Sequence, residues 1–81
     1  MNDSMTIEAT TRPSLADAQK TVGGYVELIE LNIPGHKRSQ LLVNEEGLLR
    51  QMPANIDASL IASRPIVGPA LLLLDEACWV D

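Results

Sequence analysis

The sequence predicts a small α+β domain, in which an antiparallel sheet of three to four strands has one or two short helices packed on one face. Segments rich in Val, Ile and Leu alternate with turn residues, as in a sheet, and two other segments begin with helix-capping residues. A chain of 81 residues is also long enough for one core only. We expect a flexible N-terminal segment at residues 1–12 and a single domain at residues 13–81.

The N-terminal part of the chain is expected to contain one helix. Residues 1–12 are rich in Asn, Asp, Ser and Thr and have no sustained periodicity, which is typical of a mobile terminus. Within this segment, residues 5–7 are compatible with a short edge strand. Ser14 is a favourable N-cap and Gly23 can end a helix in the left-handed conformation, so we predict a helix over residues 15–21.

Three strands are predicted in the middle of the chain. Residues 25–31 are dominated by Val, Leu and Ile, and both faces of this strand carry apolar residues. A central place in the sheet, or a face covered by a partner, would explain that pattern. Residues 39–43 predict the next strand of an antiparallel meander, and residues 48–52 predict a short returning strand after a turn at residues 44–47.

The C-terminal part is expected to contain a helix and a strand. Asn55 is well placed as the N-cap of a helix over residues 56–62, and Pro65 favours a boundary at the residue before it. Residues 66–74 form the most hydrophobic segment, which begins with β-branched residues and predicts a strand. The pair Gly68-Pro69 predicts a bulge in that strand.

The charge and hydropathy of the chain limit the classes of partner that it can bind. The net charge of −5 disfavours nucleic acid and anionic membranes, because binding to phosphates requires clustered positive charge. The one basic cluster, residues 36–38, is interpreted as a solvated loop. The longest apolar run, residues 70–74, is far shorter than the roughly 20 residues that span a bilayer, so we expect a cytoplasmic protein.

The sequence predicts no catalytic residue, no metal site and no cofactor. His36 is the single histidine and Cys78 the single cysteine, and they lie far apart in the chain. Gly23 and Gly24 precede a strand, whereas a phosphate-binding loop precedes a helix, so they are assigned a backbone role. Backbone or turn roles are also assigned to Gly47, which tolerates positive φ, and to Gly68.

Four short motifs occur in a fixed order along the chain. They are Val22-Gly23-Gly24-Tyr25-Val26-Glu27, Leu42-Val43-Asn44-Glu45-Glu46-Gly47-Leu48, Pro53-Ala54-Asn55 and Pro65-Ile66-Val67-Gly68. Jointly they resemble the domain of unknown function 3846 family over roughly residues 14–76. The chain has Met52-Pro53 where that family more often has two prolines. The resemblance implies a setting in bacteriophages, prophages and mobile elements, without an assigned chemistry.

The candidate binding residues are the polar or amphipathic members of these motifs. Tyrosine combines rigid apolar area with a hydroxyl, and asparagine offers both a donor and an acceptor. Packing of the tyrosine in the core, capping of a helix by the asparagine, and solvated turn carboxylates are the structural alternatives. The candidates are Tyr25, Glu27, Glu45, Glu46 and Asn55.

Small size, the missing catalytic apparatus and the family setting lead to a functional hypothesis. We expect a non-enzymatic accessory protein of a phage or mobile element that binds and inhibits a host protein, such as a defence component. One alternative is a protein that sequesters a small molecule, such as a nucleotide signal, between protomers, with the Gly23 and Gly24 amides lining the pocket. Another is an enzyme with an unrecognised site. A small core also favours a homo-oligomer.

Overall fold

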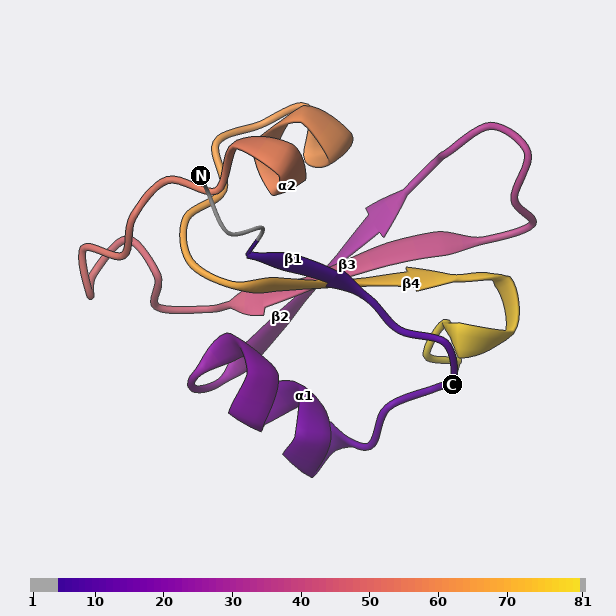
Figure 1. The fold of residues 1–81 in the computed structure, drawn as a ribbon, viewed down its shortest axis with the longest axis horizontal. Coiled ribbons are helices and arrows are strands. Elements are labelled where there is room, and N and C mark those ends of the chain that lie inside the picture. The colour runs from indigo at the N-terminus through magenta and orange to yellow at the C-terminus, as the bar shows by residue number, and fades with distance from the viewer. Residues whose placement is uncertain (1–4, 81) are drawn as a thin grey trace.

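The computed structural model describes residues 5–80, which form a four-stranded sheet with one helix on each face (Figure 1). The strand order is β1-β4-β3-β2, with β3 antiparallel to both of its neighbours and β1 parallel to β4. The predicted α+β class is therefore confirmed. In chain order the elements are β1 (Thr6–Glu8), α1 (Leu15–Val22), β2 (Val26–Leu31), β3 (Ser39–Asn44), α2 (Ile56–Ala62), β4 (Ala70–Leu74) and the 3-10 turn η1 (Asp75–Ala77).

Both helices form where their capping residues predict them. The Oγ of Ser14 accepts a hydrogen bond from the backbone N–H of Asp17 at 3.1 Å, and Gly23 ends α1 with φ of 85°. The Oδ1 of Asn55 accepts from the backbone N–H of Ala58 at 3.0 Å and begins α2. These bonds satisfy N–H groups that the first turn of a helix leaves without a partner.

The two helices, expected on one face, lie on opposite faces of the sheet (Figure 1). Ala18 of α1 packs in a cluster with Leu42, whereas Ala58 of α2 packs in a cluster with Leu41 and Val43. Successive residues of a strand point to opposite faces, so β3 contributes to both clusters. An apolar strand of this kind needs a cover on each side, and one helix supplies each cover.

The strand at the centre of the sheet is β3, and β2 lies at an edge. All six residues of β3 are buried, but every residue of β2 is exposed or only half buried. The interpretation of residues 25–31 as a central strand is therefore wrong. The apolar residues on both faces of β2 pack within the chain: Val26 packs against the core cluster on the α1 side, and Ile29 and Leu31 pack against the cluster on the α2 side.

The predicted strand at residues 48–52 is instead a turn. The backbone N–H of Arg50 donates to the Glu46 carbonyl at 2.9 Å, as in a helix, and Gln51 adopts a positive φ of 55°. These bonds coil the segment tightly, so it cannot extend along β3. The place beside β3 is taken by β4.

The last strand is shorter than predicted. Gly68 has a φ of 81°, which interrupts the extended backbone, and β4 starts only at Ala70. Before this break, Val67 forms one isolated bridge with Ala54. The predicted irregularity at Gly68-Pro69 thus separates two extended stretches.

The expected edge strand near the N-terminus is present as β1, which pairs in parallel with β4. The sheet therefore includes part of the segment that the sequence assigned to a flexible terminus. Residues 1–4 of that segment lie outside the described residues. None of the helices in the described part of the chain has the length and apolar character needed to cross a bilayer.

Candidate functional site

A groove of about 450 Å³ opens beside the β2–β3 ladder, on the face that α2 covers. Glu27 lines it because its Cα pairs with that of Val43, so the two side chains share this face of the sheet. The turn after β3 and the loop after α2 form the remaining walls. The lining residues are Glu27, Val43, Asn44, Glu45, Gly47, Leu48, Leu49, Arg64, Pro65, Ile66 and Val67.

The rim of the groove combines a closed ion pair with exposed aliphatic side chains. Arg64 Nη2 lies 3.2 Å from Glu27 Oε2, and both side chains are about half exposed. Leu48 and Leu49 are 77% and 83% exposed. Two neighbouring leucines with so little cover offer apolar area to a partner, and the ion pair leaves little net charge on that side.

Asn44 holds the turn that carries these leucines. Its Oδ1 accepts from the backbone N–H of Glu46 at 2.7 Å, and its Nδ2 donates to the Val22 carbonyl at the end of α1 at 3.1 Å. The backbone N–H of Glu45 donates to the Tyr25 carbonyl at 2.8 Å. Sequence reasoning missed Asn44, although asparagine at the start of a turn is a signal for this type of bond.

Gly47 is required by a close approach and not by its backbone angle. It does not have positive φ, so that part of the prediction is wrong. A Cβ at this position would lie 2.8 Å from Cγ2 of Val67 and 3.2 Å from its carbonyl oxygen. The absence of a side chain therefore allows the turn and the loop after α2 to meet and close the groove at its base.

Gly23 and Gly24 have backbone roles, but their amides are already occupied. Both N–H groups donate to the Gln19 carbonyl, at 2.8 and 3.0 Å, and so complete the end of α1. A Cβ on Gly24 would lie 3.0 Å from Nδ2 of Asn44. The idea that these two amides line a ligand pocket is thus wrong, because neither is directed to an open site.

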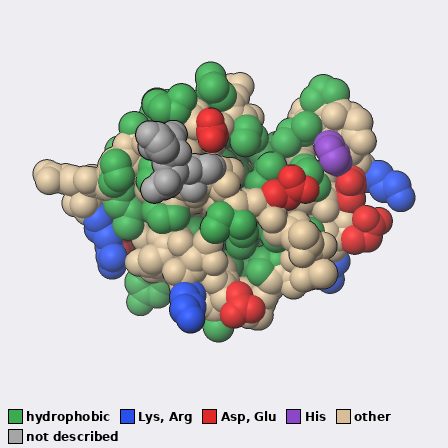
Figure 2. All heavy atoms as spheres, in the orientation of Figure 1, with side chains coloured by type: hydrophobic (Ala, Val, Ile, Leu, Met, Phe, Trp, Pro, Cys, Tyr) green, Lys and Arg blue, Asp and Glu red, His purple; other side chains and the backbone are tan. Residues whose placement is uncertain are grey.

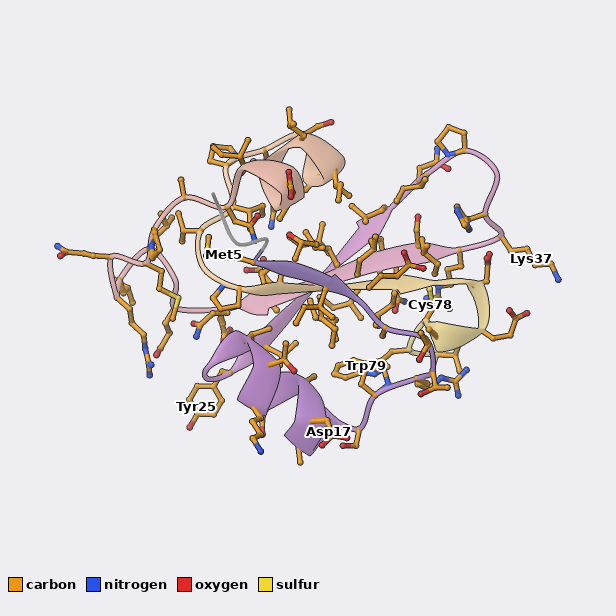
Figure 3. All side chains as sticks on the ribbon, viewed as in Figure 1. Met5, Asp17, Tyr25, Lys37, Cys78 and Trp79 are labelled. Atoms are coloured by element: carbon orange, nitrogen blue, oxygen red, sulfur yellow. The ribbon has the colours of Figure 1, made fainter. Side chains whose placement is uncertain are left out.

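Tyr25 lies on the surface and does not pack in the core. Its side chain is 64% exposed and projects away from the sheet on the side of α1 (Figure 3). It does not line the groove. The alternative of a core tyrosine is therefore wrong, and Tyr25 keeps an aromatic ring and a hydroxyl available for contact.

Asn55 is committed to the fold. It is 2% exposed, its Nδ2 donates to the Gly68 carbonyl at 2.9 Å, and its Oδ1 accepts from Ala58 and, at 3.1 Å, from Thr6 Oγ1. Gly68 itself has a left-handed backbone and packs against Met52. A side chain that is buried and bonded to three other segments is held inside the fold, so Asn55 is a structural residue.

The structure thus divides the five predicted binding residues into three groups. Glu27 and Glu45 come together in the groove, and Tyr25 and Glu46 are outside it, the latter 3.6 Å from Arg50 in an ion pair. Asn55 is buried. Sequence reasoning missed Arg64, Leu48 and Leu49, since nothing local marks a residue as part of a groove formed by distant segments.

The single histidine and the single cysteine take part in separate contacts. His36 Nδ1 lies 2.9 Å from Asp75 Oδ2, and Figure 2 shows the histidine beside acidic side chains. This contact, together with the Lys37 backbone N–H, holds the pKa of Asp75 below its usual value. The buried Cys78 thiol donates to the Leu73 carbonyl, and burial raises its pKa.

Charged side chains are scattered over the face in Figure 2 and do not gather in one patch. No group of three His, Cys, Asp or Glu side chains in the described residues is arranged to hold a metal ion. The groove therefore offers a contact surface of apolar side chains, with a paired arginine and carboxylates at its rim.

Comparison with curated proteins and with solved structures finds no match. The comparison with family models does find one, and it confirms the resemblance inferred from the four motifs. The match extends over residues 2–79, essentially the whole chain, and shows that this protein belongs to the family described as domain of unknown function (DUF3846).

Proposed function

We propose that this protein is a non-enzymatic binding module that holds a segment of another protein in the groove beside the β2–β3 ladder. The observation that carries the proposal is the exposure of Leu48 and Leu49 on a turn that Asn44 and Gly47 hold in place. Exposed leucines on a fixed turn are typical of interaction sites, because their burial by a partner removes apolar area from water.

The charges at the groove favour a particular kind of segment. Arg64 is already paired with Glu27, whereas Glu45 contributes a further carboxylate to the lining. The chain also has a net charge of −5. An apolar segment with a basic residue fits this rim, and a nucleotide or other anion does not.

The family setting supports the identity of the partner. The resemblance implies phages and mobile elements, so the partner proposed is a protein of the bacterial host, bound in the cytoplasm and inhibited by occlusion. A defence component is the class of target that a small accessory protein of this origin would be expected to bind.

A matched set of variants tests the proposal. Wild type, the double variant Leu48→Ser/Leu49→Ser and the control Leu60→Ser are immobilised and exposed to host lysate. Leu60 is 75% exposed on α2 and does not line the groove, so it controls for the loss of a surface leucine. Circular dichroism checks that all three fold.

We expect a host protein to be retained by wild type and by Leu60→Ser and lost from the double variant. The retained protein is then purified, and its activity is measured with increasing amounts of free wild type or double variant. Inhibition by wild type alone supports the proposal. Equal retention on all three surfaces, or binding without any loss of the partner's activity, contradicts it.

A further inference from the structure

A second groove, of about 400 Å³, lies between β1 and α2 and is called the β1–α2 groove below. Glu8 of β1 reaches it because its Cα pairs with that of Leu72, whose side chain packs against the core cluster beneath α2. Leu60 and Ile61 lie three and four residues after Asp57, so all three share one side of α2. The lining residues are Thr6, Glu8, Asp57, Leu60, Ile61 and Leu72.

The two carboxylates of the β1–α2 groove are not neutralised by the chain. Glu8 and Asp57 are exposed, and neither takes part in the ion pairs that join the described residues. No lysine, arginine or histidine among the described residues lines this groove. The groove beside the β2–β3 ladder differs, because its Glu27 is paired with Arg64. The β1–α2 groove therefore carries two negative charges that a ligand can neutralise.

Apolar side chains lie beside these carboxylates. Leu60 is 75% exposed, whereas Ile61 and Leu72 are half buried. The residue of α2 that is buried in the core is Ala58, so the packing of the helix leaves Leu60 at the surface. An exposed leucine next to half-buried ones offers apolar area that a partner can remove from water.

The geometry points to a segment of another protein that carries two basic side chains beside an apolar one as the ligand of the β1–α2 groove. Its lysine or arginine side chains form charge-assisted hydrogen bonds with Glu8 and Asp57. Its apolar side chain packs on Leu60. The charges thus select a basic segment, and the apolar contact distinguishes it from a free cation.

Other occupants fit the groove less well. A nucleotide or another anion would be repelled by both carboxylates. A second copy of the chain has a net charge of −5, and in its basic cluster His36 and Arg38 already contact Asp75 and Glu30. A metal ion is not favoured, since the described residues contain no group of three acidic, histidine or cysteine side chains arranged to hold one.

The inference is separate from the proposed function, because no described residue lines both grooves. A library of random peptides displayed on phage is selected on immobilised wild type. We expect the recovered peptides to include a family with two lysines or arginines near an apolar residue. One member is synthesised with a fluorescent label, and its affinity for wild type and variants is measured by fluorescence anisotropy.

The carboxylates are tested with two variants of equal net charge. Glu8→Gln/Asp57→Asn should weaken binding of the labelled peptide about tenfold, as expected for the loss of two exposed charge pairs. The control is Asp17→Asn/Glu76→Gln, whose residues line neither groove. Asp17 also lies in the first turn of its helix, so both variants lose a first-turn acid. We expect the control to bind the peptide as wild type does.

The apolar contact is tested with the leucine variants. Leu60→Ser should weaken binding of the labelled peptide about tenfold, and Leu48→Ser/Leu49→Ser should leave it unchanged. A segment held in the groove beside the β2–β3 ladder would show the opposite pattern, so the two proposals can fail separately. Circular dichroism checks the fold of each variant, and Leu60→Ser alone is decisive if the carboxylate variant does not fold.

Three results overturn the inference. The first is that no basic and apolar family is recovered from the library. The second is that the recovered peptides bind Glu8→Gln/Asp57→Asn or Leu60→Ser as tightly as wild type. The third is equal weakening by Asp17→Asn/Glu76→Gln, which would show a general attraction of basic peptides to an acidic chain and no specific site.

Discussion

Substitution of Asn55 by alanine is expected to be the most destabilising change at a predicted binding residue. The Asn55 side chain accepts the Ala58 N–H at the start of α2 and donates to the carbonyl of the buried Gly68. Loss of an N-cap costs about 1 kcal/mol. A buried carbonyl that loses its donor costs about 1–3 kcal/mol more. Together the free energy of unfolding should fall by about 2–4 kcal/mol.

Ser14→Ala provides the matched control. Ser14 also caps a helix through one bond to a backbone N–H, but its side chain makes no second bond to a distant segment among the described residues. Its loss should therefore cost only about 1 kcal/mol. The difference between the two variants isolates the role of Asn55 in joining α2 to the Gly68 loop.

Urea unfolding followed by fluorescence of Trp79, the single tryptophan, measures both variants. Its indole N–H donates to the Pro13 carbonyl at 2.9 Å, so the ring reports on the folded state. A small domain has a stability of only about 3–5 kcal/mol, so sucrose is added to all samples to extend the folded baseline. If Asn55→Ala costs no more than Ser14→Ala, the assignment of Asn55 as a structural junction is refuted.

Two further predictions concern the base of the groove and Asp75, which directly follows β4. Gly47→Ala should lower the free energy of unfolding by about 1–3 kcal/mol, since its Cβ would lie 2.8 Å from Val67 Cγ2. Adding Val67→Ala to this variant should restore only part of the lost stability, because the Val67 carbonyl oxygen would still lie 3.2 Å from the new Cβ. Urea titration of the single and double variants checks this, and no cost would contradict it. Hydrogen bonds from His36 and the Lys37 N–H lower the pKa of Asp75 in the folded state. The stabilising effect of this carboxylate is therefore fully present above its unfolded pKa of about 3.9, and it is lost as the pH falls through the folded pKa. Asp75→Asn should lose stability at neutral pH and lack this acid-dependent component in thermal melts; an unchanged pH dependence would contradict the role of these bonds.

Local signals in the sequence predicted the helices well. Ser14 with Gly23, and Asn55 with the residues after it, set the limits of α1 and α2 to within one residue. The strands β2 and β3 also lie where Val, Ile and Leu concentrate. These features depend on hydrogen bonds and side-chain preferences within a few residues, so a single sequence carries them.

The turn after β3 shows where local reasoning failed. Residues 48–52 have an apolar content that suits a strand, yet Leu48 and Leu49 are exposed on a turn. Composition alone does not state whether an apolar residue is buried in the core or displayed on the surface. The turn is set by Asn44 and by contact of Gly47 with Val67, a residue from another part of the chain.

The sequence by itself determined an acidic chain of the α+β class in a recognisable family, with two capped helices and two apolar strands after the first of them. Only the tertiary structure decided that the helices cover opposite faces, that β2 is the edge, and that Glu27 meets Arg64 across the groove. The physical reason is range: caps and turns are short-range hydrogen bonds, whereas strand order and a groove arise from contacts between segments far apart in the chain.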